Sequence, residues 1–270
     1  MENYAQVRYW IEYLPKRGYT TFSLDEAINK FPEKPRASIR SALARLSDSG
    51  AIRSVWKGFY AISLPEYGLD GIPPPLDYIE QLMEHLGVDY YVALLTAASF
   101  NGASHQAPQV FQVICNSVLR DKSKYGYRIE PSYKKSIPQK YINRVNSRTA
   151  SVAVSSPELT AVDLITYVKR AGGISNVVTV LADLAESIDF HRVDPDFFNS
   201  VPVAIIQRLG YLLDEILEEN MLADCLLEKT RQAGITFKSM PLVPNTQNSK
   251  NAYRHIKKWG VVVNYEVEIS

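Results

Sequence analysis

The sequence predicts an α+β protein, with a small N-terminal domain of helices and a β-hairpin and a larger domain of mixed helices and strands. Three observations lead to this fold class. Helical stripes and a two-residue turn fill the first 64 residues, a stretch rich in proline and glycine follows, and the rest mixes helical with β-rich segments. A chain of 270 residues, 46% of them hydrophobic, is long enough to bury both cores.

The first two predicted helices follow from apolar spacing and from their ends. Apolar residues at helical intervals run up to Leu14, and Pro15 ends this helix. The second helix begins at Ser23, because Ser23 and Glu26 form a Ser-x-x-Glu capping box, which satisfies free N–H groups at a helix start. Pro32 ends the second helix.

A third helix is expected after Pro35, a residue that the first turn tolerates because its missing N–H would have no partner there. Ile39, Leu43 and Leu46 form its apolar stripe. Gly50 is a good terminator, since glycine adopts positive φ without a Cβ clash.

Two β-prone runs, 52–56 and 59–62, flank Lys57 and Gly58, which predicts a β-hairpin with a two-residue turn. Three short helices followed by a hairpin are the elements of a winged helix-turn-helix. Order, spacing and caps all agree with this interpretation.

A proline-rich stretch follows the hairpin. The run Pro73 to Pro75 favours an extended, semi-rigid segment and marks a boundary. We therefore expect a winged-helix domain at 1–65, a linker at 66–76 and a second domain at 77–270, which can be subdivided near residue 156.

The second domain is expected to mix helices and strands. The spacing of apolar residues predicts helices at 77–86, 90–100, 158–171, 175–188, 202–218 and 221–233. It predicts strands at 109–115, 126–131, 149–155 and 260–268.

A net charge of +1 hides an uneven distribution. Residues 1–64 carry ten basic and six acidic residues, and residues 120–148 carry nine and two. Residues 183–228 carry two basic and eleven acidic residues. Such runs are usually solvated faces, but basic blocks beside a DNA-reading motif favour nucleic-acid contact.

The third helix would enter the major groove of DNA. With its apolar stripe turned inward, its outward face is basic and polar, and arginine binds guanine or phosphate while serine bonds a base edge or a phosphate. The wing adds two cations placed for backbone or minor-groove contact. The alternative is a packing or dimerisation module with a solvated arginine face. The predicted DNA-binding residues are Arg36, Ser38, Arg40, Ser41, Arg45, Arg53 and Lys57.

The second basic block offers a secondary surface for nucleic acid or for an acidic or RNA-bearing partner. Tyrosines interleave with its cations and can stack on bases, although they also suit ordinary, half-buried strand positions. The block begins with Arg120, and the residues predicted to form this surface are Lys122, Lys124, Arg128, Lys134, Lys135, Lys140, Arg144 and Arg148.

Signals for catalysis are missing, so we expect no enzyme, no metal and no cofactor. The sequence has no glycine-rich phosphate loop and no Asp/Glu-x-Lys tripeptide. Acids around Pro195 suit turns and caps better than a metal site. The four histidines lack metal-ligand spacing. They are His85, His105, His191 and His255.

Composition also indicates a compartment. Cys115 and Cys225 lie far apart and form no disulfide framework, which is typical of a reducing cytosol. The N-terminus is not a signal peptide, and the longest apolar stretch, 90–98, is too short to cross a bilayer. We expect a cytoplasmic protein with no membrane partner.

Three segments, in this order, resemble a known family: 56–62 (WKGFYAI), 90–102 (YYVALLTAASFNG) and 154–164 (VSSPELTAVDL). The chain is similar to the AbiEi-type antitoxins of type IV bacterial toxin–antitoxin (abortive infection) systems. Asn101 stands where the family pattern has histidine, and Leu159 where arginine is common.

The resemblance implies two activities. The winged helix would bind operator DNA in its own promoter and repress the operon, and the larger domain would neutralise a nucleotidyltransferase-like toxin, with or without a stable complex. Two other hypotheses stay open: a winged-helix repressor whose larger domain senses a ligand, and a DNA-processing enzyme.

Overall fold

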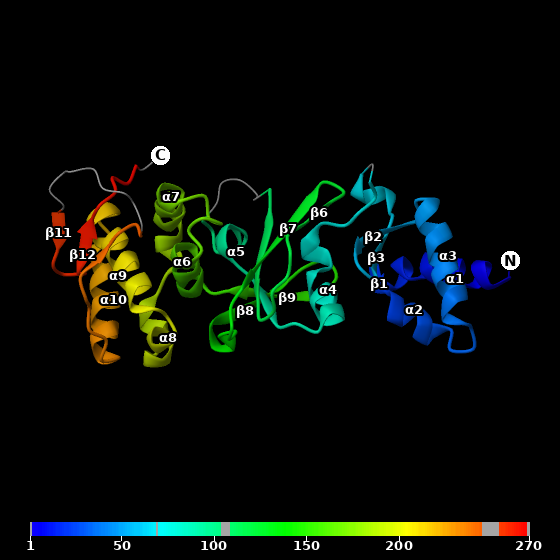
Figure 1. Cartoon of the computed structure of the whole chain (residues 1–270), viewed down its shortest axis with the longest axis horizontal. Coiled ribbons are helices and arrows are strands. Elements are labelled where there is room, and N and C mark those ends of the chain that lie inside the picture. The colour runs from blue at the N-terminus through cyan, green and yellow to red at the C-terminus, as the bar shows by residue number, and fades with distance from the viewer. Residues whose placement is uncertain (1, 69, 104–108, 245–253, 269–270) are drawn as a thin grey trace. The chain divides into compact units, whose positions relative to one another are not determined.

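The computed structural model describes residues 2–68, 70–103, 109–244 and 254–268, and it confirms the predicted α+β class. The chain folds into two compact units. The first contains residues 1–91, 109–138 and 144–153, and the second contains residues 92–108, 139–143 and 154–270 (Figure 1).

The first unit begins with helices and a small antiparallel sheet of strand order β1-β3-β2. The order helix, strand, helix, helix, strand, strand and this pairing are those of a winged helix-turn-helix. The sequence patterns missed β1, a strand of three residues that is too short to show a period, and the equally short η1. The elements are α1 (Glu2–Tyr13), η1 (Pro15–Arg17), β1 (Thr21–Ser23), α2 (Leu24–Lys30), α3 (Arg36–Asp48), β2 (Ile52–Trp56) and β3 (Phe59–Ile62).

The predicted caps are confirmed. The Ser23 hydroxyl accepts a hydrogen bond from the Glu26 amide at 3.0 Å, and the Ser23 amide donates to the Glu26 carboxylate at 2.6 Å. The stripe of α3 is buried at Ile39, Leu43 and Leu46, and with the other helices and β2 it forms one apolar core.

The sheet of the winged helix also packs through its second face. Phe59 on β3 is 1% exposed, and its ring centroid lies 6.4 Å from that of Tyr78 and 5.5 Å from that of His85. Gly71 and Pro73 of the predicted linker are buried as well. The hairpin therefore packs against residues that follow it, within the same compact unit. The linker at 66–76 stays a prediction.

A six-stranded sheet of order β6-β7-β5-β4-β9-β8 follows, with β5 parallel and β6 antiparallel to β7. The segment expected as a helix from residue 90 starts instead as β4, and Leu94 (φ 54°) begins the helix. The elements are η2 (Pro65–Tyr67), η3 (Pro75–Asp77), α4 (Ile79–Leu86), β4 (Tyr90–Val92), α5 (Leu94–Phe100), β5 (Phe111–Cys115), β6 (Lys122–Lys124), β7 (Tyr127–Tyr133), η4 (Gln139–Tyr141), β8 (Ile142–Asn146) and β9 (Ser151–Ser155).

The second unit is mainly helical, around the almost wholly buried α6. The strand expected over 260–268 is much shorter, because Asn264 leaves the ladder and its side chain bonds both backbone groups of Val243, at 3.0 and 2.8 Å. The elements are α6 (Pro157–Thr166), α7 (Ile174–Leu184), η5 (Ala185–Ser187), η6 (Phe190–Arg192), α8 (Pro195–Asn199), α9 (Val203–Tyr211), the π-helical η7 (Leu212–Ile216), α10 (Asn220–Gln232), β10 (Met240–Pro241), β11 (Arg254–Ile256) and β12 (Val261–Val263).

Within the described residues, no helix is both long enough and apolar enough to cross a membrane.

Candidate nucleic-acid interface

Helix α3 carries the predicted DNA-binding face. Arg36, Arg40, Ser41 and Arg45 are exposed, and Ser38 is half-buried. The opposite side of the helix is buried in the core of the winged helix. The first turn holds no acid and has no side-chain cap. The Ser38 amide donates to the Pro35 carbonyl at 2.9 Å, so the amides before it, of Arg36 and Ala37, are the ones that face the helix start and suit an anion. The geometry therefore brings five predicted residues onto one cationic helix surface.

Arg40 connects this face electrostatically to the small sheet. Burial raises the pKa of Tyr60 on β3, and the positive charge of Arg40 opposes that rise. Tyr60 also stacks on Phe22 of β1, with ring centroids 5.5 Å apart. The basic helix face thus borders the hairpin β2–β3, which we call the wing.

The two predicted wing residues differ in environment. Lys57 is exposed, and its backbone carbonyl lies 3.1 Å from Nε2 of His85. Arg53 is half-buried, with its guanidinium 5.8 Å from the ring centroid of Tyr125 and its Nε buried without a hydrogen-bond partner. Sequence reasoning missed Tyr125 as a neighbour, because 72 positions separate it from Arg53.

The structure divides most of the second basic block into two groups. Its larger group bonds to protein groups nearby: Arg128 to Glu130 (2.6 Å) and Asp121 (3.8 Å), Arg144 to Glu80 (2.9 Å), Arg148 to Glu66 (3.8 Å), Lys140 to Asp194, and Lys134 to the Tyr91 hydroxyl (3.1 Å). Lys135 is exposed.

Lys122 and Lys124 form the other group, on β6 beside the wing. The Lys122 ammonium lies 5.7 Å from the Trp56 ring centroid, and that of Lys124 donates to the Ser54 carbonyl at 2.5 Å. Burial lowers the pKa of Lys124, and the charge of Lys122 lowers it further. Neither ion-pairs with an acid in the described parts of the chain. Positive charge therefore accumulates where β6 meets the wing.

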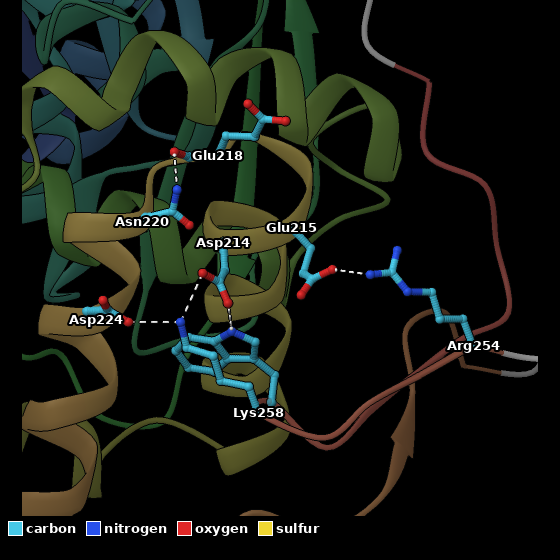
Figure 2. Close-up of polar contacts among 8 residues, drawn as sticks. Asp214, Glu215, Glu218, Asn220, Asp224, Arg254 and Lys258 are labelled. Carbon is cyan, nitrogen blue, oxygen red and sulfur yellow. Dashed lines mark hydrogen bonds and ion pairs between the residues drawn. The ribbon is translucent and has the colours of Figure 1, made fainter.

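Three acids of the block at 183–228 pair with cations near the C-terminal end of the second unit. Lys258 bridges Asp214 and Asp224, at 2.9 and 2.8 Å, and Arg254 pairs with Glu215 at 2.7 Å (Figure 2). Burial disfavours the charge on Lys258, but its hydrogen bonds to the two aspartates outweigh this and raise its pKa. From the basic block at 120–148, only Lys140 pairs with this acidic block among the ion pairs of the described residues.

No three potential metal-binding side chains gather among the residues that the structure describes. Asp189 and Asp194 cap short helices, as expected for acids around a proline turn. Cys225 Sγ lies 3.5 Å from His191 Nε2, but burial raises the pKa of this thiol and keeps it neutral. His105 lies outside the described residues.

The whole architecture resembles a solved one. The structure matches the crystal structure of the Rv2827c protein from Mycobacterium tuberculosis with a TM-score of 0.64 at 14% identity, covering 93% of this chain and 89% of that chain. At this identity the likeness shows the fold alone. No curated protein matches the chain.

A comparison with protein families finds a match over nearly half of the chain. Residues 91–215 match the family described as AbiEi antitoxin C-terminal domain. The resemblance stated from the sequence is confirmed for this part of the chain.

Two of the segments that carried the resemblance meet inside the AbiEi-type domain. The side-chain amide of Asn101 donates to the Ser155 carbonyl at 3.1 Å and to the Thr160 hydroxyl at 3.2 Å. The Ser155 and Thr160 hydroxyls lie 2.7 Å apart. Asn101, which replaces the family's histidine, thus joins α5 to the start of α6. Leu159, at the other departure, is 2% exposed and belongs to the core.

Proposed function

We propose that this protein represses its own operon through the winged helix and is also the antitoxin of a type IV toxin–antitoxin pair. The observation that carries the DNA-binding part is the exposed arginine and serine face of α3, which meets no acid before Asp48. The family match over residues 91–215 supports the antitoxin part. The partner toxin would be nucleotidyltransferase-like, and the protein would act in the cytoplasm without turnover.

Each part of the helix face has a distinct task in this proposal. Arg40 and Arg45 read bases in the major groove, where a guanidinium bonds guanine through two parallel hydrogen bonds. Arg36, in the first helical turn, binds a phosphate together with free backbone amides. Lys57 at the tip of the wing contacts the backbone and sets affinity rather than sequence preference.

Mobility-shift titration of the promoter region with the full chain tests DNA binding. The double variant Arg40→Ala/Arg45→Ala should bind at least about tenfold more weakly, since each bidentate base contact is worth about 1–3 kcal/mol. The variant Lys238→Ala/Lys257→Ala removes the same charge from exposed sites in the second unit and should bind like wild type. If the arginine variant binds like this control, α3 is not the DNA reader.

Co-expression with the product of the adjacent toxin reading frame tests the antitoxin part. The full-length Arg40→Ala/Arg45→Ala variant should still rescue growth while a promoter reporter loses repression, because neutralisation is assigned to the AbiEi-type domain. Loss of rescue by a variant that is folded and expressed like wild type would contradict this division.

A ligand-sensing repressor is the second candidate. A cavity in the second unit, far in sequence from the winged helix, is the observation that favours it.

A further inference from the structure

The cavity lies within the second unit and has a volume of about 660 Å³. Its walls come from the end of α6, the start of α7, the middle of α9 and the segment around Leu242, with Tyr265 beside it. Small-molecule sites usually measure about 300–1,000 Å³. The space is therefore large enough for a ligand of modest size.

Arg208 on α9 gives this cavity a fixed positive charge. Its Nε donates to the Leu242 carbonyl at 2.7 Å, and its Nη2 donates to the Pro241 carbonyl at 3.2 Å. These two bonds orient the planar guanidinium and leave Nη1 available. Backbone carbonyls satisfy donors but do not neutralise a charge.

The charge of Arg208 has no counterion among the described residues. Burial lowers the pKa of Arg208, and no acid offsets this. A guanidinium stays protonated in proteins, so the site holds a partly desolvated charge. Charges removed from water are normally paired, which makes an unpaired one in a cavity wall a candidate anion site.

The remaining lining fits an anion with an apolar body. Lys169 is a second cation, and no Asp or Glu is among the described residues that line the cavity. Most other lining side chains are aliphatic, including Ile165, Ile174 and Ile205. The sequence 245–253, which follows the lining residue Pro244, contains no acid either.

We propose that this cavity binds a small amphipathic carboxylate, with the carboxylate on Arg208 and Lys169 and the apolar body against the aliphatic walls. Arginine and a carboxylate form charge-assisted hydrogen bonds, which are about twice as strong as neutral ones. This role goes beyond DNA binding and toxin neutralisation and does not depend on either.

The test is thermal unfolding of the full-length protein with decanoate as the probe. Decanol, which has the same chain without the charge, is the control. Decanoate should raise the Tm in a concentration-dependent way, because a ligand of the folded state stabilises it by mass action. Decanol should do so much less. Equal shifts from both compounds, or no shift from decanoate, would overturn the proposal.

Variants locate the binding. Arg208→Gln should weaken decanoate binding, measured by calorimetry, on the order of tenfold or more, since a hydrogen bond to a charged group is worth about 1.5–3 kcal/mol. Ile205→Phe fills the cavity and keeps Arg208, so it should abolish binding even if Arg208→Gln misfolds. Lys257→Ala, an exposed lysine outside the lining, should bind like wild type. Unchanged decanoate affinity in Ile205→Phe would place the ligand elsewhere and refute the assignment.

Discussion

At the residue scale, Asp194 shows how one side chain serves two local tasks. Its Oδ1 accepts a hydrogen bond from the Phe197 amide at 3.3 Å and so caps α8. The same carboxylate also bonds Lys140 and the hydroxyl of Tyr141. The pattern of acids around a proline predicted the cap. It did not predict the partners, because Lys140 and Tyr141 lie more than fifty positions earlier in the chain.

The pH dependence of stability tests this residue. Hydrogen bonds from Lys140 and Tyr141 lower the pKa of Asp194 from 3.8 to about 2. The unfolded chain therefore holds this proton more tightly, and the stabilisation, complete above about pH 4, is lost as the pH falls towards 2. Asp194→Asn keeps a capping oxygen but removes the charge. Urea unfolding should show it less stable than wild type at pH 7, with the difference vanishing near pH 2. Asp196→Asn, an exposed neighbour, should match wild type throughout.

At the element scale, the sequence located a capped helix start well, but it placed the C-terminal ends of two helices too late: those expected to reach 171 and 188 end at Thr166 and Leu184. The capping box at Ser23 was found because its two residues, Ser23 and Glu26, lie three positions apart in the sequence. Strands depend on distant partners. β1 escaped notice although it pairs with β3, and the expected long C-terminal strand stops at Val263 because Asn264 bonds Val243 instead.

The junction of α9 and the C-terminal segment depends on a close approach that the sequence does not reveal. Gly210 has ordinary helical φ, but a Cβ there would overlap the ring of the fully buried Trp259. The indole Nε1 donates to Asp214 at 2.8 Å, and the Trp259 carbonyl accepts from the Gln207 side chain at 2.7 Å. The ring is thus fixed against the helix at its one glycine.

Gly210→Ala should therefore destabilise the protein, although alanine favours helices by about 1 kcal/mol over glycine. Overpacking a rigid core costs about 1–3 kcal/mol, so thermal unfolding should begin at a lower temperature. A double-mutant cycle with Trp259→Leu supplies the control. With the ring removed, the same Gly210→Ala change should be neutral or stabilising. Equal destabilisation in both backgrounds would mean that Trp259 is not the obstacle.

At the scale of the whole molecule, the charge blocks were visible in the sequence, but their partners were not. Three acids of the block at 183–228 bind Lys258 or Arg254, and a fourth, Asp194, binds Lys140 of the basic block. Most of the basic block divides between local acids and the wing. The sequence shows how many charged side chains a segment carries. Only the fold shows which of those side chains form ion pairs.

The last prediction concerns Lys122 and Lys124, which form no ion pair with an acid of the described residues. Lys122 and Lys124 lie against the wing, within the first compact unit, so they should add phosphate contacts to those of α3. For the full chain on promoter DNA, the logarithm of affinity should fall with the logarithm of salt concentration, with a slope of about 0.9 per phosphate contacted. Lys122→Ala/Lys124→Ala should weaken binding to specific and random DNA alike and reduce that slope by one to two contacts, about 0.9–1.8. Lys238→Ala/Lys257→Ala, which removes equal charge elsewhere, should leave the slope unchanged. Suppose that Arg40→Ala/Arg45→Ala abolishes specific binding while Lys122→Ala/Lys124→Ala keeps the wild-type slope. The proposal that α3 binds DNA would then be supported, and the predicted phosphate contacts of β6 would be wrong.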